Sequence, residues 1–142
     1  MIYTDLTKKA LNIAYRAHQG QLDKGGCPYV FHPYHLAEQM ETEDEICVAL
    51  LHDVLEDSNI SIDDLKSCGF SEAIIEAIIV LTKKKGCSYS EYIQRVSKNL
   101  LSKKIKCADI KHNLNLSRLN CITDKDLERY YHYQQALDLL LK

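Results

Sequence analysis

The run Val48-Ala49-Leu50-Leu51-His52-Asp53-Val54-Leu55-Glu56-Asp57 decides how the rest of the sequence is interpreted. In a helix, where each residue advances by about 100°, this run separates its side chains into two faces. One face is aliphatic, and the other carries an imidazole and carboxylates from His52, Asp53, Glu56 and Asp57. His52 and Asp53 can both reach one metal ion, and the other two carboxylates lie one turn further on, close to a ligand of that ion. The alternative is an amphipathic helix with a solvated acidic face.

Length and composition predict one soluble globular domain that spans residues 1–142. With 46% hydrophobic and 27% charged residues, the 142-residue chain has an ordinary composition and is long enough for a single buried core. The net charge of −2 gives no reason to expect nucleic-acid binding. We expect no signal peptide and no association with a membrane, because no apolar run reaches the length of a span. The sequence leaves the oligomeric state open.

The six cysteines are far apart in the sequence and include no C-x-x-C pair. This spacing argues against a zinc-binding or disulfide framework. Cys47 and Cys107 fall in apolar periodic segments and are predicted to be small core residues. Because free thiols are typical of a reducing compartment, we expect a cytoplasmic protein.

Apolar residues recur at helical spacing along the chain, and no convincing alternating strand is present. Ser61, Ser71 and Thr123 are helix-start signals, and Ser61 with Asp64 has the spacing of a capping box. The isoleucine-rich run 74–79 would also suit a strand, but its flanking caps favour a helix. The sequence therefore predicts an all-α bundle of about seven or eight short helices.

Two further residues could complete a metal site with His52 and Asp53. His32 precedes Pro33 at a predicted helix entrance, and its apolar neighbours indicate that it is at least partly buried. Asp109 is an acidic residue among apolar ones on a later helix, where an aspartate often pairs with a lysine instead. Two histidines and two aspartates without a thiolate suit Mn²⁺, Fe²⁺ or Zn²⁺. Open coordination positions would make such a site catalytic rather than structural.

The spacing of His32, the His52-Asp53 pair and Asp109 resembles that of the HD-domain phosphohydrolases. The chain is most similar to one branch, the hydrolase domain of the RelA/SpoT stringent-response enzymes and its small stand-alone relatives. The matching segments are His18-Gln19-Gly20-Gln21, Pro28-Tyr29, His32-Pro33, Ala49 to Asp53, Glu56-Asp57, Leu81-Thr82-Lys83 and Lys106 to Leu114. The resemblance implies a compact HD-domain helical bundle. It also implies a hydrolase without synthetase activity, because we find no nucleotidyl-transferase domain.

The same resemblance implies roles for individual residues. A mononuclear Mn²⁺ site, with Fe²⁺, Co²⁺ or Zn²⁺ as other candidate ions, would be formed by His32, His52, Asp53 and Asp109. The attacking water would be positioned and deprotonated by Glu56 and Asp57, and a small-molecule nucleotide would be contacted by Lys24 and Asn113. The implied reaction removes the 3′-diphosphate from guanosine tetra- or pentaphosphate, (p)ppGpp.

One position departs from the pattern of the relatives. They usually carry Arg-Lys where this chain has Asp23-Lys24, and an aspartate would repel phosphate and cannot stack on a base. We expect the loop from Gln21 to Cys27 to border the metal pocket. Asp23 therefore keeps open a phosphatase of another nucleotide, either NADPH-type or a nucleoside monophosphate. A non-catalytic nucleotide-binding module is a further alternative.

Overall fold

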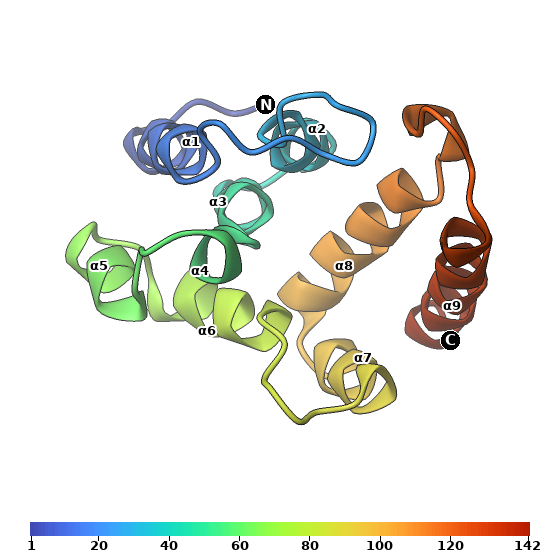
Figure 1. Cartoon of the computed structure of the whole chain (residues 1–142). Helices are drawn as coiled ribbons and strands as arrows, with labels where there is room; N and C mark the ends of the chain where they lie inside the picture. Colours follow the sequence, from blue (N-terminus) through green and yellow to red (C-terminus); the bar gives the residue numbers. More distant parts are fainter.

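The computed structural model describes residues 1–142, and its regular elements are all helical (Figure 1). In chain order they are α1 (Asp5–Ala17), α2 (Phe31–Glu38), α3 (Glu43–Leu51), α4 (Val54–Asp57), α5 (Ile62–Ser67), α6 (Glu72–Leu81), α7 (Tyr89–Ser97), α8 (Leu100–Asn113), the 3₁₀-helix η1 (Leu116–Arg118) and α9 (Asp124–Leu140). The prediction of an all-α fold is confirmed. The isoleucine-rich run lies within α6, as expected.

Helix α3 is the centre of the fold, and it packs against α1, α2, α6 and α8. Figure 1 shows it between the α1–α2 pair and α6. All six residues from Ile46 to Leu51 are buried, with exposed fractions of 1% or less. A helix that is apolar on every side belongs inside a core. The two-faced helix expected from the sequence is therefore not what forms here.

The helix breaks immediately before Asp53, so the three carboxylates do not lie on the buried helix, while His52 at its end is buried. Leu51 ends α3, and the backbone of Asp53 leaves the helical region with φ −107° and ψ 1°. The His52 ring turns back, and its Nδ1 lies 2.7 Å from the carbonyl oxygen of Ala49. A second short helix, α4, then carries the remaining carboxylates. This break adds one helix, so that nine α-helices form where the sequence predicted about seven or eight.

Side-chain caps fix the other helix starts except that of α2, where Val30 forms no capping hydrogen bond. Thr4, Thr42, Ser61 and Thr123 each form a capping box, and the predicted pairing of Ser61 with Asp64 is among them. A cap of this kind contributes about 1 kcal/mol to stability. Ser71 caps α6 as predicted.

The prediction of core positions holds for one of the two cysteines. All six thiols are free, and Cys47 is buried in the core as predicted, whereas Cys107 is only half-buried and packs against the core from its edge. None of the helices combines the length and the apolar character needed to cross a membrane.

Candidate metal centre

Three of the four predicted ligands converge in the structure. His32 on α2, His52 after α3 and Asp109 on α8 each offer one ligand atom, and these atoms lie within 4.8 Å of one another. All three residues are buried. Ligand atoms about 2 Å from a common ion must lie within about 4 Å of each other, so small side-chain movements would let the three residues hold one ion.

The hydrogen bonds of the two imidazoles leave ligand atoms directed at the centre. The bond between His52 Nδ1 and the Ala49 carbonyl places a proton on Nδ1, and the buried Nε2 makes no hydrogen bond. His32 Nε2 lies 2.8 Å from Asp109 Oδ1, and His32 Nδ1 lies 2.7 Å from His112 Nδ1. A buried nitrogen without a hydrogen-bond partner, beside a second imidazole and a carboxylate, fits a divalent metal ion.

Asp53 lies beside this group but is not one of the three converging residues. Its Oδ2 is 3.0 Å from His52 Nε2, although the geometry is not that of a hydrogen bond, and it accepts a hydrogen bond from the Tyr29 hydroxyl. Burial alone would lower the pKa of His52, but the carboxylates of Asp53 and Asp109 raise it to about 9. The negative charge of the two aspartates thus favours a cation at this place.

Two donors besides the nearby histidines hold Asp109 in place. Lys106 Nζ lies 2.8 Å from Oδ2, and Asn113 Nδ2 donates to Oδ1 at 3.1 Å. Burial would raise the pKa of Asp109, but the Lys106 ammonium keeps it well below its usual range. Asp109 therefore forms an ion pair with a lysine, which was the alternative to metal binding considered for this residue, and it also lies with His32 and His52 in the metal centre.

Glu56 and Asp57 follow the centre on α4. Glu56 Oε1 accepts a hydrogen bond of 2.9 Å from the backbone N–H of Lys83, and burial raises the pKa of this carboxyl group. Asp57 Oδ2 accepts a hydrogen bond of 3.2 Å from Gln21 Nε2, and the amide oxygen of Gln21 lies 2.9 Å from His18 Nδ1. Both carboxylates are therefore held in place by groups from elsewhere in the chain.

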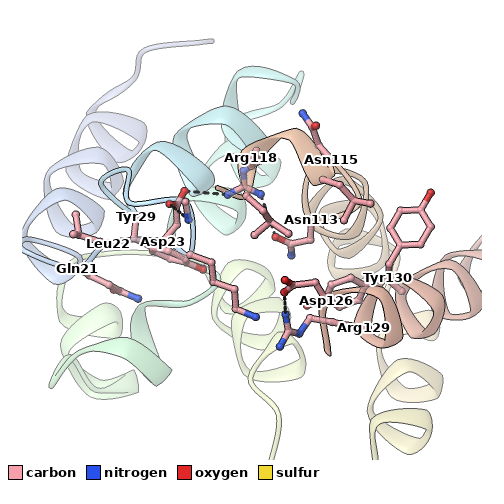
Figure 2. Close-up of a pocket in the computed structure, with 15 residues that line it drawn as sticks. Gln21, Leu22, Asp23, Tyr29, Asn113, Asn115, Arg118, Asp126, Arg129 and Tyr130 are labelled. Carbon is pink, nitrogen blue, oxygen red and sulfur yellow. Dashed lines mark hydrogen bonds and ion pairs between the residues drawn. The ribbon is translucent and has the colours of Figure 1, made fainter. Parts of the chain in front are cut away.

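A pocket of about 310 Å³ lies next to the centre, between the loop that follows α1 and the first half of α9 (Figure 2). The predicted substrate-binding residues Lys24 and Asn113 both line it. Tyr29 and Asn113 connect it to the metal residues, because they bond to Asp53 and Asp109 respectively. Residues 21–25 of the loop that was expected to border the metal pocket line this pocket, but none of the four proposed metal ligands does. A volume of this size matches a small-molecule site.

Asp23 lines the pocket and also makes contacts within its own loop and with η1. Its Oδ1 accepts hydrogen bonds of 2.9 Å from the backbone N–H groups of Gly25 and Cys27, and its Oδ2 lies 3.5 Å from Arg118 Nη2. Figure 2 marks this ion pair with a dashed line between Asp23 and Arg118. The carboxylate therefore shapes its own loop, and its charge is balanced by a guanidinium from η1. It does not present an uncompensated negative charge to a ligand.

The structure places three further residues in contact with the site residues, none of them a predicted site residue: Lys106, His112 and Arg118. Lys106 bonds to Asp109, His112 to His32, and Arg118 to the side-chain oxygen of Asn113 at 3.3 Å. For Lys106 and His112 a signal existed, since both lie three residues from Asp109 on the same helix. Arg118 gave no signal, because its contact with Asp23 joins segments far apart in the sequence.

Comparison with known proteins finds no matching family model, but several curated relatives. The chain is 29% identical over 127 residues to a GTP pyrophosphokinase of Myxococcus xanthus, which covers 78% of this chain and 17% of that protein. It is 31% identical over 121 residues to the bifunctional (p)ppGpp synthase/hydrolase SpoT of Escherichia coli. This match covers 75% of the present chain and 17% of SpoT. A guanosine-3′,5′-bis(diphosphate) 3′-pyrophosphohydrolase of Borreliella burgdorferi is 37% identical over 79 residues. This match covers 53% of the present chain and 12% of that protein. The chain thus spans less than a fifth of the length of these relatives.

A solved structure shows the same fold. The metazoan ortholog of SpoT that hydrolyzes ppGpp superposes with a TM-score of 0.82 and 23% identity, covering 100% of this chain and 88% of that one. At this identity the match establishes the all-α architecture, and the sequence matches supply the relationship. The resemblance indicated by the sequence motifs is confirmed: the chain is a relative of the RelA/SpoT proteins, similar to one segment of them.

Proposed function

We propose that this chain is a metal-dependent nucleotide phosphohydrolase that removes the 3′-diphosphate from (p)ppGpp. The observation that supports this most strongly is the convergence of His32, His52 and Asp109, buried beside a pocket of about 310 Å³. The relatives named for synthesis or hydrolysis of the same nucleotide support the choice of substrate. The six free thiols are in keeping with action in the reducing cytoplasm.

The proposed ligands are the three converging residues together with Asp53, and we propose Mn²⁺ as the ion. Oxygen and nitrogen donors without a thiolate suit Mn²⁺, with Fe²⁺, Co²⁺ and Zn²⁺ as competitors. When bound, such an ion lowers the pKa of a water molecule and stabilises charge that develops on the phosphate. His32 and His52 would each present Nε2, because their Nδ1 atoms are engaged with His112 and with the Ala49 carbonyl.

The two carboxylates of α4 would orient the attacking water and accept its proton. Glu56 uses Oε1 to accept from the Lys83 backbone, so Oε2 is available to accept a proton. Partial desolvation raises the pKa of Glu56, which makes it a stronger base than a fully solvated carboxylate. Asp57, held by Gln21, would orient the same water. Lys24 and Asn113 would hold the nucleotide in the pocket.

A panel of nucleotides tests the proposal. Purified protein with added Mn²⁺ should release pyrophosphate from (p)ppGpp, and a chelator should abolish the reaction. Release of monophosphate from NADPH or from nucleoside monophosphates, with (p)ppGpp left intact, would instead support the alternative phosphatase. Binding without turnover of any nucleotide would support a non-catalytic module.

His112 should act as a positioning residue for the metal ligand His32. Burial together with the charge of Arg118 lowers the pKa of His112 to about 4, so its ring is neutral and can accept the His32 Nδ1 proton. The two ring planes lie within 4° of each other, which suits this in-plane bond. Replacing His112 by alanine should weaken Mn²⁺ binding by about 10–100-fold, as measured by calorimetric titration.

His35 offers a matched control for this experiment. Its ring packs against His112 at a centroid distance of 4.3 Å but makes no hydrogen bond to a proposed ligand. His35→Ala should therefore leave the Mn²⁺ affinity close to that of the wild type. His112→Asn, whose side-chain oxygen can accept the same proton, should recover part of the affinity. Equal affinities for His112→Ala and wild type would rule out the positioning role.

A further inference from the structure

The guanidinium group of Arg118 joins three segments of the chain at the pocket. Its Nη1 donates to the carbonyl oxygen of His112 at 3.1 Å and to Asn113 Oδ1 at 3.3 Å, both at the end of α8. Its Nη2 lies 3.5 Å from Asp23 Oδ2 on the loop that follows α1 (Figure 2). The Arg118 side chain is 22% exposed. Because its hydrogen bonds go to neighbouring residues of the site, Arg118 is suited to hold those residues in place.

Backbone contacts press the Asp23 loop against the segment that carries Arg118. Asn120 Nδ2 donates a hydrogen bond of 3.2 Å to the carbonyl oxygen of Gly25. A methyl group added to Gly25 would lie only 1.9 Å from the carbonyl oxygen of Arg118, so a glycine is needed for this close approach. The ion pair between Asp23 and Arg118 therefore forms between two segments that already touch.

These contacts determine which way the side-chain amide of Asn113 faces. Its Nδ2 donates to Asp109 Oδ1 at 3.1 Å, and its Oδ1 accepts from Arg118. An ionised carboxylate can only accept and a guanidinium can only donate, so the opposite orientation would lose both bonds. One N–H of the amide is left over, and Asn113 lines the pocket. Asn113 is thus set to donate a hydrogen bond to an oxygen atom of a ligand.

We propose that Arg118, held by Asp23, is a positioning residue that fixes Asn113 as a hydrogen-bond donor to the substrate. The proposal rests on the proposed function, in which Asn113 contacts the nucleotide. It also gives Asp23 a part in substrate binding that its own charge does not suggest, because the carboxylate acts through Arg118. Asp23→Arg should therefore weaken binding, since it would place two guanidinium groups against each other.

Steady-state kinetics on (p)ppGpp with saturating Mn²⁺ test the assignment. Arg118→Ala should raise KM by about tenfold and leave kcat within about twofold, because the held amide serves binding and not the chemical step. Asn113→Ala should raise KM at least as much. Adding Arg118→Ala to Asn113→Ala should then change KM by less than about twofold. A merely structural role of Arg118 would make the two effects multiply, and that result would overturn the proposal.

Variants of the loop extend the kinetic test. Asp23→Ala should reproduce part of the rise in KM and Asp23→Arg all of it. Lys111→Ala is the matched control, because it removes an exposed positive charge from α8 close to Asn113, and it should leave KM unchanged. A fall in KM for Asp23→Arg would contradict the proposal.

Nuclear magnetic resonance of the ¹⁵N-labelled full chain without nucleotide tests the geometry separately from the reaction. The side-chain amide signals of Asn113 are identified by their absence from the Asn113→Ala spectrum. They should move toward the positions of an exposed amide in Arg118→Ala and in Asp23→Arg, but not in Lys111→Ala. Asp23→Arg keeps Arg118 and supplies the test if Arg118→Ala does not fold. Unmoved signals would overturn the positioning role, whereas moved signals in a chain that does not hydrolyse (p)ppGpp would disprove the proposed reaction alone.

Discussion

Replacing Asp109 by alanine should abolish Mn²⁺ binding and lower the free energy of unfolding by about 3–5 kcal/mol. The first effect follows because a proposed ligand between two histidines is lost. The second follows because the buried ammonium of Lys106, 2.8 Å from Asp109 Oδ2, would be left without a carboxylate. Urea denaturation followed by circular dichroism measures the stability, and calorimetric titration measures the metal affinity.

The double variant Lys106→Met, Asp109→Leu separates these two effects. It removes both members of the buried ion pair, so most of the stability should return while metal binding stays lost. If the double variant is stable and still does not bind Mn²⁺, Asp109 is needed for the metal itself. Wild-type metal affinity in either variant would remove Asp109 from the ligand set.

Exchanging Glu56 for glutamine should keep the metal and reduce the catalytic rate by about 10²–10⁴-fold, the usual effect of losing a general base. Asp53→Ala should instead lose both the bound metal and the activity. The two variants should differ because Asp53 is a proposed ligand of the ion, whereas Glu56 is the proposed acceptor of the water proton. The measurements are kcat on (p)ppGpp with saturating Mn²⁺ and, separately, the Mn²⁺ affinity of each variant.

The glutamine variant is a mild change in structural terms. Its side-chain oxygen can still accept the hydrogen bond that the Lys83 backbone donates to Glu56 Oε1, so the connection between α4 and the segment after α6 is retained. Thermal stability close to that of the wild type is the expected control result. Equal loss of bound metal in the Glu56 and Asp53 variants would show that Glu56 is a ligand and would exclude its assignment as the base.

The sequence predicted the helices well because local signals determine them. Ser61 and Ser71 cap the helices that they were expected to cap, and hydrophobic periodicity separated helix from strand at the isoleucine-rich run. The break after His52 could not be predicted in this way, since no glycine or proline marks it. It depends on a ring that turns back to the Ala49 carbonyl once α3 is buried on all sides.

The candidate site was predicted in part, and the parts that were missed depend on tertiary contacts. The types and spacing of His32, His52 and Asp109 suggested a common ion, and the structure brings them together. The bond between His32 and His112 and the ion pair of Asp23 with Arg118 link residues that are 80 and 95 positions apart. No local pattern reports such contacts, so the sequence alone presents Asp23 as an unpaired charge near the substrate.

The two sides of the pocket differ in how firmly they are anchored. The metal residue His52 directly follows α3, whose last six residues are all buried, whereas α9 fully buries only Ala136 and Leu140 over its 17 residues. A helix attached by few buried side chains can detach locally at a lower free energy than that of global unfolding. Transient detachment of α9 would admit a nucleotide or release a product while the metal residues keep their places. The entry and release of ligands would then depend on α9, whereas the geometry of the reaction centre would depend on the buried helix α3.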